Sequence, residues 1–136
     1  EYDGLQVANR VEAGKRPLSS MSPTMIFDKN GNIHSLTGSP GGTSIIGYVA
    51  KSIIGLLDWE MSPQEAINVP HYMRKKEQTE LEKDTELEKI KEILINKGHE
   101  VSIKRKRSGL HVAKKVDGGY IGGADIRGEG TIIQID

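Results

Sequence analysis

Apolar and polar positions along the chain predict strands near both ends and helices between them. Apolar runs at 25–27 and 33–37 flank a polar turn at 28–32, whose Asn-Gly pair tolerates positive φ, so we expect a β-hairpin there. Further strands are predicted at 71–76, 101–106, 110–116 and 120–124.

Two helices are expected in the first half of the chain. The apolar residues between 45 and 57 recur at the spacing of one wide helical face, with Thr43 or Ser44 as the N-cap. The next helix begins at Ser62, because Pro63 suits the first helical position and Glu65 completes a capping box. Pro70 then stops this short helix.

A third, amphipathic helix is predicted from Asp84 or Thr85 to Lys97, with Gly98 as its C-terminal stop. The charged stretch 77–83 before it is expected to be a turn or a short exposed segment. A strand pair, then helices, then more strands indicates an α+β domain with an antiparallel sheet.

Composition narrows the possible functions. The 136 residues are enough for one domain, and the formal net charge of zero provides no general attraction for nucleic acid. The chain has no cysteine, which excludes disulfides and thiolate ligands, and no apolar run approaches the length of a membrane span. The basic run 104–107 is interpreted as a solvated strand edge, because basic side chains discourage edge pairing.

Two segments carry the candidate chemistry. Ser19 and Ser20 place adjacent hydroxyls after a proline, and this pair is either ordinary turn chemistry or a carboxylate-binding site. Gly41 and Gly42 end a glycine-rich loop that precedes an apolar helix, where backbone N–H groups can face an anion or an oxyanion. The loop lacks the Gly-Lys-Ser/Thr signature of a nucleotide-binding P-loop.

The remaining candidates have weaker patterns. A serine nucleophile would need a nearby base, but the four histidines (His34, His71, His99 and His111) follow no catalytic or metal-ligand spacing, so structural or surface roles are favoured. Asp125 and Arg127 are interpreted as a local ion pair, with a role at a site as the alternative.

Several motifs, in this order, resemble the small subunit of the γ-glutamyltranspeptidases. They are Lys-Arg-Pro-Leu-Ser-Ser-Met-Ser-Pro-Thr at 15–24, Thr-Gly-Ser-Pro-Gly-Gly at 37–42, Ala-Ile-Asn-Val-Pro-His at 66–71, Lys-Gly-His-Glu-Val at 97–101 and Gly-Gly-Ala-Asp-Ile-Arg at 122–127. The resemblance runs from about Lys15 to Arg127, nearly the whole chain.

The resemblance implies an αββα four-layer sandwich of the N-terminal-nucleophile hydrolases, made from one precursor that cleaves itself into two subunits. Residues 1–136 would be the C-terminal part of the small subunit, a single domain completed by the large subunit. Ser19 and Ser20 would bind the α-carboxylate of a γ-glutamyl substrate, and Gly41 and Gly42 would form the oxyanion hole. Arg127 is a further candidate contact for a carboxylate, and no cofactor or metal is implied.

The chain also departs from the family pattern. The family's threonine nucleophile is expected upstream of Glu1, so this chain alone should be inactive, and Thr43 and Ser44 stand where an arginine often follows the glycine pair. The implied reaction is γ-glutamyl transfer or hydrolysis, with glutathione or poly-γ-glutamate as the substrate, in the periplasm, secreted or at the surface of a bacterium. The alternatives are a capsule-type enzyme acting on poly-γ-glutamate and a non-catalytic relative that binds a carboxylate.

Overall fold

The larger of two sheets contains four antiparallel strands in the order β1-β2-β6-β7 in the computed structural model, which describes residues 4–133. The strands are β1 (Thr24–Phe27), β2 (Ile33–Gly38), β6 (His111–Val116) and β7 (Gly119–Ala124). The predicted hairpin at 28–32 is confirmed, because the Asp28 carboxylate accepts the N–H groups of Asn30 and Asn32 at 2.8 and 2.9 Å and Gly31 has a φ of 82°.

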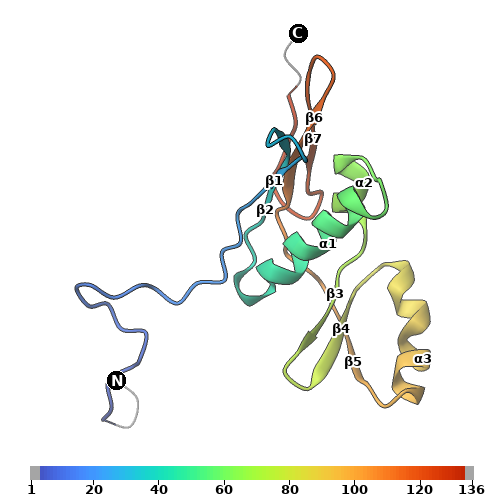
Figure 1. Cartoon of the computed structure of the whole chain (residues 1–136). Coiled ribbons are helices and arrows are strands. Elements are labelled where there is room, and N and C mark those ends of the chain that lie inside the picture. The colour runs from blue at the N-terminus through green and yellow to red at the C-terminus, as the bar shows by residue number, and fades with distance from the viewer. Residues whose placement is uncertain (1–3, 134–136) are drawn as a thin grey trace.

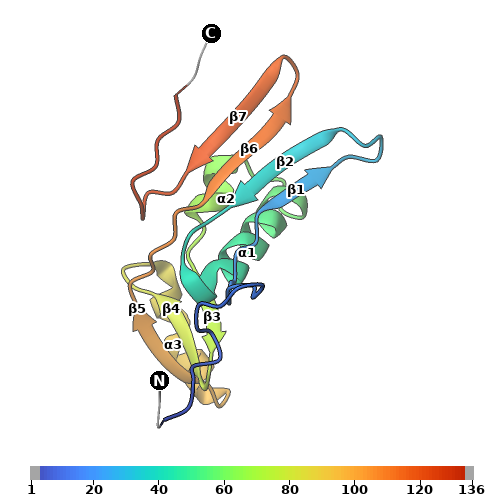
Figure 2. The same cartoon turned by 90° about the vertical axis from the view of Figure 1, so that its left-hand side faces the viewer.

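Helices α1 (Ile45–Leu57) and α2 (Pro63–Asn68) cover one face of this sheet, as Figures 1 and 2 show. The capping box of Ser62 and Glu65 is present as predicted. A 3₁₀ turn, η1 (Gly42–Ser44), leads into α1, and Ser44 occupies the N-cap position without making a side-chain cap bond.

The hydrophobic core lies between the two helices and the sheet. Its buried residues are Ile45, Tyr48, Val49, Leu56, Ala66, Ile67, Leu110 and Val112. A β-carbon at Gly55 would lie 2.9 Å from that of Ala66, so the glycine lets α1 and α2 approach closely. A hydrogen bond of 2.9 Å between the buried hydroxyls of Thr37 and Ser52 joins β2 to α1.

The second sheet contains β3 (Tyr72–Lys75), β4 (Gln78–Glu82) and β5 (Glu100–Lys104), with β4 in the centre. The expectation of an exposed turn at 77–83 is therefore wrong. Glu80 and Glu82 in this stretch are buried because they meet cations: Glu80 accepts from Lys104 and Lys106 at 2.8 and 2.6 Å. Burial opposes ionisation of Glu80, but these two hydrogen bonds lower its pKa to about 2.

The strand pair β4–β5 is parallel, whereas the other strand pairs of the described residues are antiparallel, in line with the expected mainly antiparallel strands. The crossover between the two strands carries η2 (Glu86–Ile90) and α3 (Lys91–Asn96), which occupy the predicted helix 84–97 as a 3₁₀ segment followed by a short α-helix. Gly98, at a φ of 85°, ends it as predicted. The basic run is not wholly solvated, because Lys106 is buried against Glu80.

A methyl group added at Gly123 tests the contact between β7 and α2. Its β-carbon would lie 2.8 Å from the backbone of Pro63 and Gln64, whereas nothing lies within 4 Å of one at Gly119 in the same strand. We expect Gly123→Ala to lower the free energy of unfolding by about 1–3 kcal/mol in urea titrations, because backbone cannot easily move aside. Gly119→Ala is the matched control, and equal effects of the two changes would contradict this packing.

Candidate functional site

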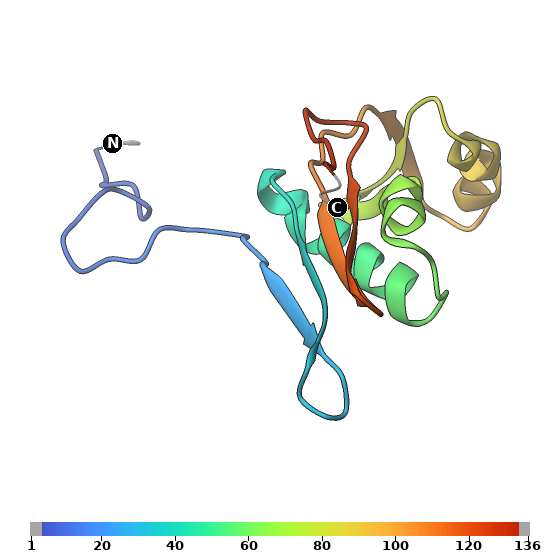
Figure 3. The same ribbon diagram turned by 90° about the horizontal axis from the view of Figure 1, so that it is seen from above.

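The two segments predicted to carry chemistry lie at the same end of the β1–β2 hairpin. Thr24 pairs with Thr37, so the chain enters β1 and leaves β2 side by side. Residues 19–23 arrive at this point and residues 38–42 depart from it, while the earlier N-terminal residues run away from the body of the molecule (Figures 1 and 3). The segments that carry the Ser19-Ser20 and Gly41-Gly42 pairs therefore leave the same end of the hairpin.

Ser19 is exposed and Ser20 is half-buried, in a segment without regular secondary structure. The Ser19 oxygen accepts the N–H of Met21 at 3.1 Å, and the hydroxyl of Ser22 donates to the Ser20 carbonyl at 3.1 Å. These bonds shape the turn but use neither the Ser19 nor the Ser20 hydroxyl hydrogen. Both hydroxyls can therefore donate to an external acceptor such as a carboxylate.

The glycine pair has a backbone conformation that suits glycine. Gly41 has φ 140° and Gly42 has φ 59°, and a β-carbon at Gly41 would lie 2.7 Å from the ring of Tyr48. Among residues 4–133, neither amide finds a hydrogen-bond acceptor, while the Gly41 carbonyl accepts the N–H of Ser44 at 3.2 Å. Two consecutive free N–H groups in such a turn can receive an oxyanion.

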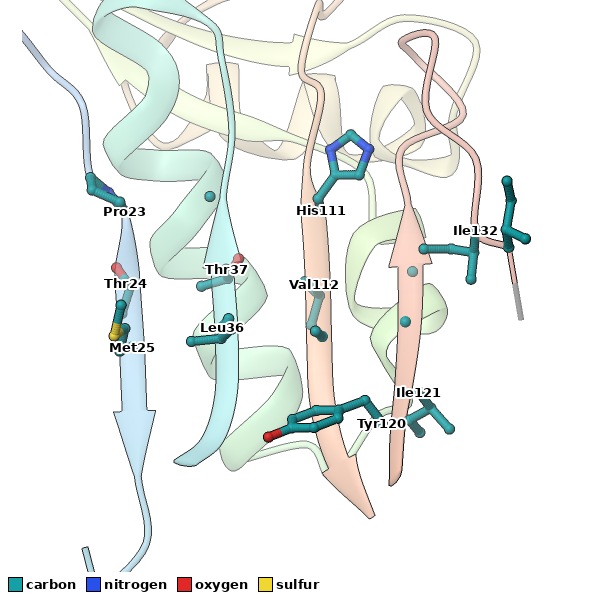
Figure 4. Close-up of a pocket in the computed structure, with 15 residues that line it drawn as sticks. Pro23, Thr24, Met25, Leu36, Thr37, His111, Val112, Tyr120, Ile121 and Ile132 are labelled. Atoms are coloured by element: carbon teal, nitrogen blue, oxygen red, sulfur yellow. The ribbon is translucent and has the colours of Figure 1, made fainter. Parts of the chain in front are cut away.

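An apolar groove of about 680 Å³ lies on the face of the larger sheet opposite the helices (Figure 4). Thr24, Thr37, Gly38 and His111 line it at the end where the glycine loop begins. The rest is apolar, with large exposed side chains such as Tyr120, so the groove offers a surface for packing and only a few polar contacts.

Arg127 lies in a buried polar cluster, away from solvent. Its guanidinium forms a bidentate ion pair with Glu82 and contacts Asp125 at 3.1 Å, so the predicted ion pair with Asp125 is confirmed. It also donates to the carbonyls of residues 67, 68 and 69 at the end of α2. With its side chain 10% exposed, Arg127 holds the fold together, and its contact with a substrate carboxylate stays a prediction.

The Asp125 carboxylate is surrounded by donors. It accepts the Ser108 hydroxyl at 2.5 Å and the N–H groups of Leu110 and Arg127 at 3.1 and 3.0 Å. Burial by itself would raise the pKa of Asp125, but these hydrogen bonds and the Arg127 charge bring it below its usual value. Asp125 is thus ionised at neutral pH, and its negative charge balances the positive charge of Arg127.

His71 completes the cluster and is 1% exposed. Its Nε2 lies 2.8 Å from the Ser108 oxygen, and the Ser108 hydroxyl donates its hydrogen to Asp125. The imidazole therefore donates to Ser108 in this contact. It does not accept the serine proton, as the base of a serine nucleophile would. Burial, followed by the charges of Lys51 and Arg127, lowers the pKa of His71 to about 3.

Lys51 approaches the same cluster from α1. Its ammonium donates to the Val69 carbonyl, next to the carbonyls that Arg127 binds. Burial and the Arg127 charge lower the pKa of Lys51 to about 8. Sequence reasoning missed the roles of Lys51, His71, Glu82 and Ser108, because none of them stands near its partners along the chain.

Within residues 4–133, no group of three or more histidine, aspartate or glutamate side chains is arranged to hold a metal ion. The helices of this part of the chain are also too short or too polar to cross a membrane.

Solved structures of γ-glutamyltranspeptidases share this fold. A mutant of the Helicobacter pylori γ-glutamyltranspeptidase superposes with a TM-score of 0.78 at 30% identity, over 87% of this chain and 66% of that chain. The Bacillus anthracis transpeptidase CapD gives 0.77 at 27% identity, over 96% and 78%. The mixed α/β fold is thus that of the N-terminal-nucleophile hydrolases.

Sequence comparison narrows this class to one family. The profile of the γ-glutamyltranspeptidase family matches residues 2–135, so the chain belongs to that family. The glutathione hydrolase proenzyme of Escherichia coli strain K12 is 38% identical over 99 residues, which are 71% of this chain. The matched part spans 17% of the length of that proenzyme.

Loss of the Arg127 charge should destabilise the protein strongly. Arg127→Met would leave Glu82 and Asp125 buried without their cation, so we expect the free energy of unfolding to fall by about 3–5 kcal/mol. Arg107→Met, at an exposed position, is the matched control and should change it by less than about 0.5 kcal/mol. Chemical denaturation of both variants measures the difference, and a stable Arg127→Met variant would contradict the structural role.

His71 should make stability depend on pH. Its pKa is about 3 in the folded protein and about 6.5 in the unfolded chain, so below pH 6.5 only the unfolded chain takes up the proton. The free energy of unfolding therefore decreases as the pH is lowered, and His71 contributes about 2 kcal/mol of this decrease between pH 6.5 and 5. Unfolding titrations across this range should give a smaller slope for His71→Gln, and an unchanged slope would rule out the neutral buried imidazole.

Proposed function

We propose that this chain supplies the carboxylate-binding and oxyanion-stabilising part of an enzyme that transfers or hydrolyses γ-glutamyl groups. The observation that carries the proposal is the arrangement at one end of the β1–β2 hairpin. The segments with the Ser19-Ser20 hydroxyls and the Gly41-Gly42 amides both leave the hairpin at this end, and the described residues use none of these donors.

In the proposed reaction, a nucleophilic hydroxyl attacks the γ-glutamyl carbonyl carbon, and the carbonyl oxygen becomes an oxyanion. The amides of Gly41 and Gly42 donate to that oxyanion, and each such donor is typically worth about 2.7–4 kcal/mol. The oxyanion then re-forms the carbonyl as the C–N bond breaks, the leaving amine takes up the proton that the attacking hydroxyl has lost, and a γ-glutamyl ester remains on the enzyme. Water releases glutamate from this ester, or an amine accepts the γ-glutamyl group.

Ser19 and Ser20 act on the other end of the glutamyl group. Their hydroxyls donate to its α-carboxylate, and such charge-assisted hydrogen bonds are stronger than neutral ones. This places the γ-carbonyl at a fixed distance from the bound carboxylate and so orients it for attack.

The partner of this chain is proposed to be the large subunit of the same precursor, and residues 1–136 the C-terminal part of the small subunit, a single domain. The open apolar face of the β1-β2-β6-β7 sheet supports this, since a second sheet would bury it in an αββα sandwich. The attacking threonine is assigned to a segment of the precursor outside this chain, and the proenzyme to the periplasm, exterior or surface of a bacterial cell.

Glutathione is the proposed substrate. Curated relatives named glutathione hydrolase match the sequence, with the E. coli protein 38% identical over 71% of this chain. Among solved structures, the H. pylori γ-glutamyltranspeptidase is 30% identical against 27% for the B. anthracis transpeptidase CapD, so the capsule-type alternative is not favoured. A non-catalytic relative that binds a carboxylate is distinguished by one assay, because only an enzyme releases chromophore from γ-glutamyl-p-nitroanilide.

Replacing both serines should weaken substrate binding in the complete enzyme. We expect Ser19→Ala with Ser20→Ala to raise KM for γ-glutamyl-p-nitroanilide roughly 100-fold, because two hydrogen bonds to a charged group are lost. Steady-state kinetics measure the change.

Ser102→Ala is the matched control for that experiment. Ser102 lies in β5, and its buried hydroxyl has no hydrogen-bond partner among the described residues, so its removal should leave KM unchanged. Unaltered KM in the double variant would overturn the carboxylate-binding role of the serine pair.

A further inference from the structure

Gly41 rests directly on the ring of Tyr48. A β-carbon at Gly41 would lie 2.7 Å from Cε2 and 3.1 Å from Cδ2 of that ring, so the glycine backbone and the aromatic edge are in close contact. Tyr48 is 3% exposed and stands in the first turn of α1, directly after the glycine loop. The Tyr48 ring therefore packs against the backbone of Gly41, the first residue of the glycine pair.

The Tyr48 ring also contacts a second aromatic side chain. The imidazole of His71 packs against its ring, with 4.1 Å between the ring centroids and 41° between the planes. His71 bonds Ser108 at 2.8 Å, and Ser108 bonds Asp125 at 2.5 Å. The ring thus contacts both Gly41 and His71, the residue that links it to the buried ion-pair cluster.

The glycine loop also contacts Gly109, the residue that follows Ser108. The Ser39 oxygen accepts the N–H of Gly109 at 3.1 Å, and a β-carbon at Gly109 would lie 2.8 Å from the Pro40 ring. The backbone just before Gly41 is therefore anchored next to Ser108, the residue that His71 contacts. These contacts leave Gly41 little freedom, although glycine by itself has more than any other residue.

We propose that Tyr48, braced by His71, is the positioning residue of the Gly41-Gly42 turn and holds its two amides toward the oxyanion. The assignment rests on the proposed function, in which these amides act on the transition state. Tyr48 touches the glycine backbone and no part of the substrate. An oxyanion hole is effective because its donors are oriented before the reaction begins, so a loose turn lowers the rate even when the substrate still binds.

The test compares Tyr48→Leu with Tyr48→Phe in the complete enzyme. Leucine removes the flat ring, and we expect kcat for γ-glutamyl-p-nitroanilide to fall about 10- to 100-fold with KM within about twofold. Phenylalanine keeps the ring, and kcat should return to within about threefold of the wild-type value. A kcat of Tyr48→Leu near that of the wild type, or a Tyr48→Phe as impaired as Tyr48→Leu, overturns the proposal.

Leu81→Ala separates positioning from a general loss of stability, because Leu81 is 1% exposed but lies in β4 of the other sheet. This variant should be destabilised with kcat unchanged; a fall in kcat equal to that of Tyr48→Leu overturns the proposal.

Hydrogen exchange decides the question independently of activity. The N–H groups of Ser44 and Ile45 donate to the Gly41 and Gly42 carbonyls, and we expect both to exchange at least tenfold faster in Tyr48→Leu than in Leu81→Ala. Equal exchange overturns the positioning role. If the wild-type enzyme releases no chromophore, the proposed function fails, and the exchange of these two amides still decides for or against Tyr48.

Discussion

The guanidinium of Arg127 is the contact on which the rest of the architecture depends. It bonds Glu82 of β4 in the smaller sheet, Asp125 after β7 in the larger sheet and the last carbonyls of α2. An arginine can do this because its planar fork offers five donors and stays charged. Each acceptor would be costly to bury without it, so the two sheets and the helix are held as one unit.

The buried cluster around Arg127 is connected to the glycine turn of the site through a series of contacts. Asp125 orients Ser108, Ser108 meets His71, and His71 supports Tyr48 beneath the glycine turn. The groups proposed to meet substrate, in contrast, are exposed or half-buried, and the described residues do not use their hydrogen-bond donors. A rigid interior thus supports a hairpin end whose donors remain free, which is the arrangement that binding of an anion requires.

Much of the local structure was predictable, because its causes lie within a few residues. Asp28 and Gly31 make the hairpin turn, Ser62 and Glu65 start α2, and Gly98 ends α3. The central strand β4 was missed because its glutamates suggested an exposed segment. Lys104 and Lys106, which pair with Glu80, are more than twenty residues further along the chain, so no local pattern reveals that Glu80 is buried.

The motifs at 15–24 and 37–42 determined the candidate site without any structure, since two hydroxyls after a proline and two glycines before a helix are local features with a chemical meaning. The sequence also determined the hairpin from whose one end both motifs extend. Only the tertiary structure decided that Arg127 lies in a buried cluster and that Tyr48 and His71 support Gly41. The physical reason is that burial and ion pairing depend on residues that meet only when the sheets and helices pack.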